Sequence, residues 1–438
     1  MQLKRRTSER GLMLAAKHMA NGACAGILSL AMATSLFAQS GQRGYNQIYN
    51  FNSVVGPTAL TGSGNTLYGA TQEGGSQGVG SVYSLTMPAT PGNPWTLTTL
   101  YSFVSGSSDG INPYSVAIGG FSGSLPILYG TCSSGGKYGK GTVFRLVPPQ
   151  TTGGTWTEQI LHNFHHTDGA TPLAPLAVAI RPGQLPILYG TTGAGGASPG
   201  FGSGTIFSLT PPTTQGGGWT EDVLYSVVSD GTEGQVPNNV VLGSGPGGPV
   251  LYGFAVIGGT LGGGVVFSLA ESGSTWTYSV LYNLPQSVVI SSPTSLTLGS
   301  NGVLYGTAAP TNEPSTGGEV YSLTPPTSEG GAWTENTVYT FGAVFQDGVG
   351  PRSVFMGTNG NLYGVTSDGG TGAYGTVFAL TPPASPGGLW TENVLYNFPF
   401  NGETGGPTSL AIGPQGALYG TTDYIGGFTV STVFELQP

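Results

Sequence analysis

The chain has 438 residues, including 78 glycines and 32 prolines, and its formal net charge is −9 at pH 7. Only 7% of the residues are charged, which is too few for a solvated disordered chain. The acidic balance argues against nucleic acid and anionic lipid as partners, because phosphate binding requires clustered Lys and Arg.

The N-terminal segment, residues 1–38, has the pattern of a secretory signal peptide. Five basic residues come first, and an apolar stretch from about Ala23 to Phe37 follows them. That stretch is too short to remain in a bilayer as a helix, so we expect cleavage and no membrane span in residues 39–438. The remaining chain then carries 6 basic and 19 acidic residues, a net charge of −13. We expect it to be secreted, periplasmic or attached to the cell surface.

A tandem repeat occupies the rest of the chain. The tripeptide Leu-Tyr-Gly occurs seven times, at intervals of 53 to 63 residues. Its tyrosines are Tyr68, Tyr129, Tyr189, Tyr252, Tyr305, Tyr363 and Tyr419. In the copy from Arg352 to Phe398, four β-prone runs alternate with short, turn-rich connections. These runs are Ser353–Met356, the residues around Leu362–Gly364, Thr376–Thr381 and Trp390–Phe398. Four short strands per repeat of this length are typical of a propeller blade.

Counting the runs predicts how the ring closes. The Leu-Tyr-Gly run and the Val-Phe run each occur seven times, but the tryptophan-led fourth run occurs only six times. A copy without tryptophan stands at the other end, at Tyr45–Phe51, and it matches Leu395–Phe398. We therefore predict an all-β fold in residues 39–438. It is a single seven-bladed β-propeller with four antiparallel strands per blade, in which the N-terminal strand closes the last blade.

The repeat pattern LYGTT…GG…GTVF.LTPP…WTE..LY.F…DG..P, over residues 44–438, resembles the GloVer tandem repeat of secreted bacterial proteins. The resemblance implies an extracytoplasmic repeat protein and no characterised activity. Proteins of that family carry varied C-terminal anchors, and we identify no such anchor in this sequence.

The tryptophan-led runs also carry most of the repeated charge. Four of the six tryptophans precede Thr-Glu, which places Glu158, Glu221, Glu335 and Glu392 on the fourth run. If the fourth strand is outermost, these glutamates lie on an exposed sheet edge, where charge prevents edge-to-edge aggregation. We interpret the tryptophans as a cover for the blade rim rather than as a sugar site.

Asp-Gly turns supply the candidate binding residues. They occur in loops that lead to the next repeat, at Asp109, Asp168, Asp230 and Asp347. Each suits a tight turn, because Asp hydrogen-bonds the local backbone and Gly tolerates positive φ. Together they raise a second hypothesis, an acidic rim around the central channel that attracts cationic groups or hydrogen-bonds sugar hydroxyls. Lys137 and Lys140 lie on the same predicted face, where they could pair with Asp168 or contact an anionic ligand.

All histidines after the signal segment fall in residues 162–166. His162 occupies a position held by tyrosine in other copies, so we expect it on a strand. His165 and His166 lie in the following loop with Asp168, and histidine with carboxylate can bind a transition metal such as zinc. Adjacent histidines rarely point at one ion, so loop residues without a ligand remain the alternative.

No enzyme motif is present, whether a Gly-x-Ser-x-Gly elbow, a His-Glu-x-x-His pair or a phosphate loop. Our first hypothesis is a non-enzymatic binding or scaffold protein without a cofactor, a monomer whose partner is a polysaccharide or a cell-surface protein. The second is a carbohydrate-active hydrolase or lyase that uses carboxylates of the Asp-Gly loops. The third is a structural element of a surface layer.

Overall fold

The computed structural model describes residues 44–437 except 54, 107, 152, 198–201, 215, 229, 287–291, 310–316, 329, 345, 386, 400–405 and 424–429. The predicted signal segment, residues 1–38, lies outside the described residues. Within them, no helix combines the length and the apolar character that crossing a bilayer requires.

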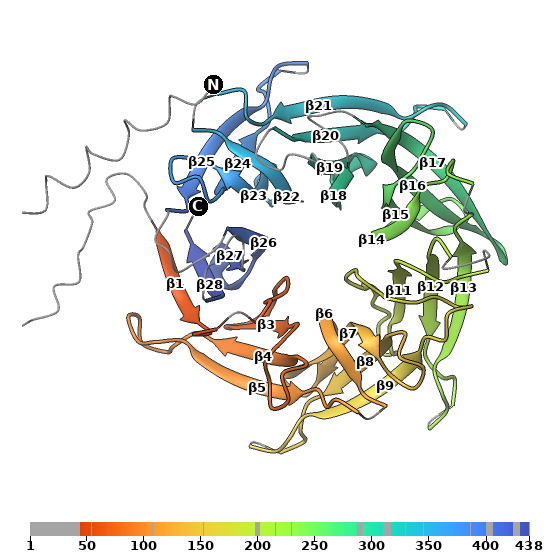
Figure 1. Ribbon diagram of the computed structural model, residues 1–438, viewed down its shortest axis with the longest axis vertical. Coiled ribbons are helices and arrows are strands. Elements are labelled where there is room, and N and C mark those ends of the chain that lie inside the picture. Colours follow the sequence, from red (N-terminus) through yellow and green to blue (C-terminus); the bar gives the residue numbers. More distant parts are fainter. Residues whose placement is uncertain are drawn as a thin grey trace, which may run out of the picture. The chain divides into compact units, whose positions relative to one another are not determined.

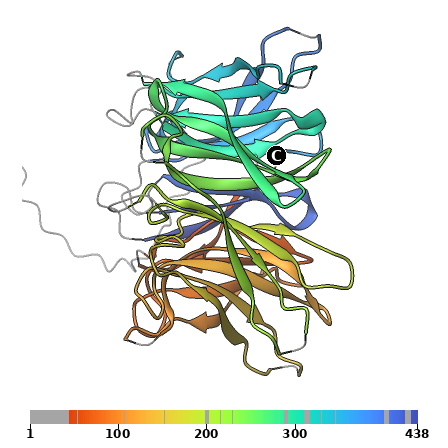
Figure 2. The same ribbon diagram turned by 90° about the vertical axis from the view of Figure 1, so that its right-hand side faces the viewer.

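Seven four-stranded antiparallel sheets form a ring around a central channel (Figure 1). The first strand of each blade faces the channel and the fourth lies at the outer rim. In the view turned by 90°, loops extend to both faces of the ring (Figure 2). The predicted all-β, seven-bladed propeller is confirmed.

Blades 1 to 6 each use four consecutive strands. The strands of blades 1 to 3 are β2 (Thr61–Ser63), β3 (Thr66–Thr71), β4 (Ser81–Thr86), β5 (Thr96–Ser102), β6 (Gly110–Ser122), β7 (Leu125–Gly135), β8 (Thr142–Val147), β9 (Thr157–Asn163), β10 (Ala177–Ala179), β11 (Ile187–Thr192), β12 (Thr205–Thr210) and β13 (Thr220–Ser226). Those of blades 4 to 6 are β14 (Gln235–Gly245), β15 (Gly248–Ile257), β16 (Gly262–Ser272), β17 (Thr275–Pro285), β18 (Ser292–Leu298), β19 (Leu304–Ala309), β20 (Glu319–Thr324), β21 (Thr334–Thr340), β22 (Gly348–Met356), β23 (Leu362–Gly369), β24 (Thr376–Thr381) and β25 (Thr391–Asn397). Two single 3-10 turns, η1 (Ser300–Gly302) and η2 (Pro414–Gly416), precede the second strands of blades 5 and 7.

Blade 7 joins the two ends of the chain. It contains β26 (Pro407–Ile412), β27 (Leu418–Thr422) and β28 (Thr432–Leu436), and its outer strand is β1 (Tyr45–Asn50). β1 runs antiparallel to β28, with Tyr45 opposite Leu436 and Asn50 opposite Thr432 (Figure 1). The predicted closure by the N-terminal strand is therefore confirmed, and the pairing leaves neither β1 nor β28 without a neighbour in the sheet.

The second strand of each blade carries the Leu-Tyr-Gly tripeptide, and steric crowding explains why its third residue is glycine. A Cβ built on Gly364 would lie 2.4 Å from the Phe378 ring and 2.3 Å from the carbonyl oxygen of Ser353. Gly130 and Gly420 have the same environment, with Phe144 and Phe434 in the place of Phe378. The aromatic ring of the third strand thus covers a position where only glycine fits.

The blades are joined by apolar side chains from both neighbours. Between blades 2 and 3, for example, Tyr129 and Val143 of one blade pack with Leu188 and Phe207 of the next. The outer-strand tryptophans take part in this packing. Five of them lie edge-on or tilted against the Leu-Tyr-Gly tyrosine of the preceding blade, with ring centroids 5.7 to 6.1 Å apart. The tryptophans fill the space between neighbouring blades, which is a structural role of the kind that we inferred from the sequence.

Candidate functional site

The predicted site residues lie at the boundaries between blades, which we name by the two blades that meet. Within the described part of the chain, at six of the seven boundaries, all but 7/1, an aromatic residue on the fourth strand of one blade lies near a residue on the fourth strand of the next. At boundary 5/6 these are Tyr339 and Glu392, whose hydroxyl and carboxylate oxygens are 3.3 Å apart. A third residue, the aspartate of the Asp-Gly turn, joins the pair from the loop between the blades.

Two boundaries hold the trio in the same form. Tyr339 Oη donates to Asp347 Oδ2 at 3.2 Å, and the backbone N–H of Gly342 donates to the same oxygen at 3.0 Å. At boundary 1/2, Tyr101 Oη donates to Asp109 Oδ2 at 3.0 Å, and Glu158 is near. Asp109 and Asp347 are only 9% and 7% exposed. These aspartates therefore anchor an interblade loop and are not open to a large ligand.

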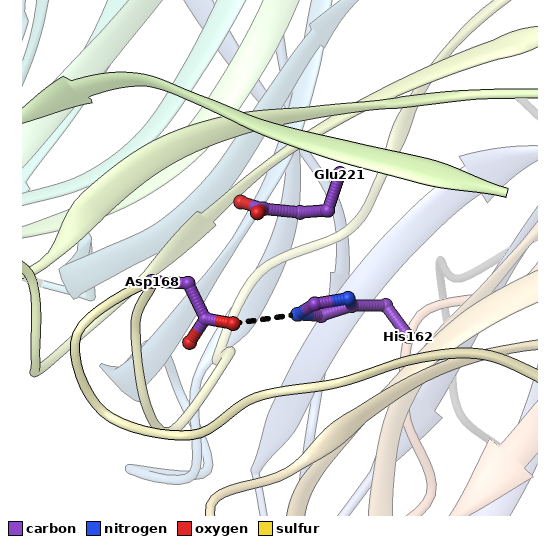
Figure 3. Close-up of side chains that lie close together, drawn as sticks. All are labelled: His162, Asp168 and Glu221. Carbon is purple, nitrogen blue, oxygen red and sulfur yellow. Dashed lines mark hydrogen bonds and ion pairs between the residues drawn. The ribbon is translucent and has the colours of Figure 1, made fainter.

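Boundary 2/3 differs because histidine replaces the tyrosine. His162 Nε2 lies 2.9 Å from Asp168 Oδ2, and the backbone N–H of His165 donates to Asp168 Oδ1 at 2.9 Å. Although burial acts to raise the pKa of Asp168, the hydrogen bonds from His162 and His165 lower it below its ordinary value. Glu221 of β13 points toward this pair from the neighbouring blade (Figure 3). The three residues bring an imidazole and two carboxylates together.

The structure gives Asp230 a different position from the other three aspartates. It is exposed, and its Oδ1 accepts hydrogen bonds from the N–H and the hydroxyl of Thr232. Glu233 occupies the interblade position instead, where its Oε1 accepts from Tyr225 Oη at 2.6 Å. The sequence contained the signal, since Glu233 follows Tyr225 by eight residues, as Asp347 follows Tyr339. The four aspartates thus do not form one rim, and none of them lines the central channel.

The fourth-strand glutamates are not solvated edge charges, so that interpretation was wrong. In each of Glu158, Glu221, Glu335 and Glu392, Oε1 is buried without a hydrogen-bond partner among the described residues. The fourth strand of the preceding blade lies against each glutamate, which a sequence pattern for a single blade does not reveal. Burial, with the charge of Asp347, raises the pKa of Glu392 to about 7. Burial, with the charge of Asp168, raises that of Glu221 to about 8.

The remaining predicted residues lie in the loops near boundary 2/3. His165 Nδ1 is 2.9 Å from Asp168 Oδ1, whereas His166 has a left-handed backbone with φ of 85°. Lys137 and Lys140 are exposed, and Lys137 Nζ lies 5.1 Å from the centre of the Tyr138 ring. Within the described ranges, the side chains close enough to share a metal ion are His162, Asp168 and Glu221.

A second candidate site, which the sequence did not reveal to us, is the central channel. A cavity of about 500 Å³ is lined by residues of all seven blades. In every blade except blade 3, the lining includes the residue X that follows a proline near the start of the blade, and X is Thr58, Tyr114, Asn238, Thr294, Arg352 and Thr408. In blades 2, 5, 6 and 7, X is the unpaired residue of a β-bulge in the first strand. Bulges turn a side chain out of the sheet's alternation, here toward the channel.

The channel lining combines polar and apolar side chains. Arg352 and Asp423 are its charged residues among those described, and Asn238, Asn239 and the threonines add amides and hydroxyls. Burial raises the pKa of Tyr114 and the positive charge of Arg352 opposes this, so guanidinium and phenol are within electrostatic reach. The lining therefore offers hydrogen-bond donors, acceptors and aromatic rings around a small cavity.

The repeat itself identifies the family. The model of the Gloeobacter/Verrucomicrobia repeat matches residues 34–248 and 244–438. The chain belongs to this family. The family resemblance inferred from the Leu-Tyr-Gly and Trp-Thr-Glu pattern is thereby confirmed. A comparison with curated proteins gave no match.

Solved structures similar to this Gloeobacter/Verrucomicrobia repeat protein share little sequence with it. The extracellular domains 1–2 of Drosophila semaphorin 1a are 10% identical, with a TM-score of 0.50 over 90% of this chain and 88% of that one. Sqt1 from Chaetomium thermophilum is 14% identical, with a TM-score of 0.49 over 89% and 99%. An α-L-arabinanase from Penicillium chrysogenum is 13% identical, with a TM-score of 0.43 over 90% and 98%. At 10% identity, the similarity to semaphorin 1a bears on the fold alone.

Proposed function

We propose that this chain is a secreted, non-enzymatic binding protein that holds a neutral, hydroxyl-rich saccharide at the central channel. The observation that carries the proposal is the set of Pro-X residues. The proline recurs around the ring and the bulge recurs in four blades, but X varies among Thr, Tyr, Asn and Arg. A side chain that varies within a constant frame, and that faces one cavity, is free to determine a ligand.

The chemistry of the lining fits sugar hydroxyls. Arg352 supplies donors, Asp423 supplies acceptors, and the amides of Asn238 and Asn239 supply both. The Tyr114 ring offers an apolar face on which a sugar ring can lie. The cavity of about 500 Å³ is within the usual range of small-ligand sites. The negative charge of the chain works against an anionic glycan, which favours a neutral one.

Two observations favour binding over hydrolysis or lyase chemistry. Glycoside cleavage commonly uses a pair of carboxyl groups that flank the scissile bond. In the described lining of the channel, Asp423 is the only carboxylate, and its Oδ1 accepts a hydrogen bond from Ser431 Oγ at 3.0 Å. The Asp-Gly carboxylates Asp109 and Asp347 lie in closed boundaries and bond to tyrosines.

The test is a glycan array that contains neutral and uronate-bearing oligosaccharides, followed by calorimetry on the best neutral ligand. We expect the Arg352→Gln and Tyr114→Ala variants each to bind it about tenfold more weakly or worse, since each removes a charged hydrogen bond or a ring contact. A parallel assay measures depolymerisation of the same glycans, and we expect none.

The matched control is Asp230→Asn, which alters an exposed loop carboxylate away from the channel and should leave affinity unchanged. If Asp230→Asn weakens binding while Arg352→Gln does not, the acidic loops and not the channel hold the ligand. Turnover of any bound glycan would establish the hydrolase or lyase alternative instead.

A further inference from the structure

We propose that boundary 2/3 is a binding site for a divalent transition-metal ion, with His162, Asp168 and Glu221 as its ligands. Each residue offers one ligand atom, and these atoms all lie within 4.8 Å of one another. The three side chains point toward a common centre from a strand, a loop and the strand of the next blade (Figure 3). This site is separate from the channel and does not depend on the proposed saccharide.

The distances require only a small adjustment. Zinc binds histidine nitrogen and carboxylate oxygen at about 2.0–2.2 Å, which in tetrahedral geometry separates two ligand atoms by about 3.3–3.6 Å. His162 Nε2 and Asp168 Oδ2 are 2.9 Å apart, so they need to separate by about half an ångström. The loop that carries Asp168 can supply this, and the Glu221 carboxylate moves inward to complete the trio.

Asp168 is already oriented for such a role. Its Oδ1 accepts the backbone N–H of His165 at 2.9 Å, which leaves Oδ2 directed at His162. A ligand carboxylate whose other oxygen is held by a hydrogen bond is typical of metal sites. The side chains of His162 and Asp168 are 19% and 9% exposed, so the centre is shielded but an ion can reach it.

The other boundaries provide a comparison within the same molecule. A glutamate with one unpartnered buried oxygen occurs at four boundaries and therefore does not by itself indicate an ion. What distinguishes boundary 2/3 is the imidazole of His162, a side chain that commonly acts as a ligand of transition metals. Tyr101 and Tyr339 occupy the same position elsewhere, and burial raises the pKa of both phenols, so they remain hydrogen-bond donors.

The ligand set defines the class of ion. Two carboxylates supply the negative charge that a divalent cation neutralises, and an imidazole favours zinc and its first-row neighbours over calcium or magnesium. The experiment therefore uses Zn²⁺ as the probe, titrated calorimetrically into the processed chain purified without a polyhistidine tag. We expect one Zn²⁺ per chain and a rise in the thermal unfolding midpoint with added Zn²⁺.

Three variants test the assignment. His162→Tyr installs the residue of the other boundaries and Glu221→Gln preserves shape, and each should weaken Zn²⁺ binding by about tenfold or more. His166→Asn keeps a residue that tolerates positive φ and should bind Zn²⁺ like the parent chain. Because Glu221→Gln keeps the size and shape of the side chain, circular dichroism should show that this variant is folded, and it tests the ligand set independently of how the shorter loop accepts the phenol of His162→Tyr.

Contrary outcomes are clear. The proposal fails if the parent chain takes up no stoichiometric Zn²⁺, or if His162→Tyr and Glu221→Gln both bind it with unchanged affinity. Loss of binding in His166→Asn alone would transfer the site to the loop histidines. None of these results depends on saccharide binding, so the two proposals are tested separately.

Discussion

Boundaries 2/3 and 5/6 use the same three positions of the repeat and differ in one side chain type. At boundary 5/6, the Tyr339 hydroxyl lies 3.2 Å from Asp347 and 3.3 Å from Glu392, and thus connects both carboxyl groups. At boundary 2/3, His162 contacts Asp168 at 2.9 Å, and Glu221 Oε1 has no hydrogen-bond partner among the described residues. The phenol of Tyr339 thus links both carboxyl groups of its trio. The imidazole of His162 links only one, and we propose that a metal ion can join the three side chains.

The loops are adapted to the two side chains. Asp347 follows Tyr339 by eight residues, but Asp168 follows His162 by only six. An imidazole reaches less far from the backbone than a phenol, so the aspartate must come closer. The shorter loop brings it closer, which shows how a repeat preserves a contact while one residue changes its chemistry.

Deleting the strand that closes the ring should have the largest effect on stability. Deletion of residues 44–52 removes β1, and with it Tyr45, which stacks on Tyr396 at boundary 6/7 with ring centroids 3.9 Å apart. It also exposes the edge of β28. We expect most of a typical domain stability, about 5–15 kcal/mol, to be lost, as measured by thermal unfolding of the processed chain. An unchanged melting temperature would mean that closure contributes little.

Breaking one trio should have an intermediate effect. Asp347→Ala leaves the Gly342 N–H without its acceptor inside boundary 5/6, and it removes one of the two carboxyl groups that the Tyr339 hydroxyl contacts. One orphaned backbone donor and one lost phenol–carboxylate hydrogen bond correspond to a destabilisation of about 2–4 kcal/mol, measurable by urea unfolding. Asp230→Ala is the control, and it should leave the urea midpoint nearly unchanged because Asp230 is exposed. Equal midpoints for the two variants would contradict the anchoring role of Asp347.

The smallest expected effect is a change in how the melting temperature depends on pH. Burial, together with the charge of Asp347, raises the pKa of Glu392 to about 7 from 4.5, and the hydrogen bond from Tyr339 opposes this. Between those two pH values the folded state keeps a proton that the unfolded state loses, so the contribution of Glu392 to stability falls as pH rises. Glu392→Gln stays neutral and should therefore reduce the difference in melting temperature between pH 5 and pH 8.

Glu73→Gln serves as the control for this pH dependence, because Glu73 is exposed on the surface. It should keep the pH dependence of the parent chain. A Glu392→Gln variant with the same pH dependence as the parent would show that Glu392 ionises alike in the folded and unfolded states.

The sequence predicted the architecture more completely than it predicted the candidate site. Seven Leu-Tyr-Gly runs and six tryptophan-led runs are enough to predict seven blades and the closing strand at Tyr45. The same reasoning treated Asp230 as the equivalent of Asp347, because both precede a glycine. It did not consider how many residues separate each aspartate from the preceding tyrosine. It also treated Glu392 as a charge on an exposed sheet edge. A single repeat does not show that the fourth strand of the preceding blade covers this glutamate.

The sequence by itself determined the number of blades, the strands in each and the way the ring closes, because these follow from local patterns that recur along the chain. Only the tertiary structure decided which residues share a site. Tyr339 and Glu392 meet although they are 53 residues apart, and Arg352 and Asp423 line one channel from different blades. Such encounters depend on blade packing and on bulges that redirect side chains, and neither follows from the order of residues in one repeat.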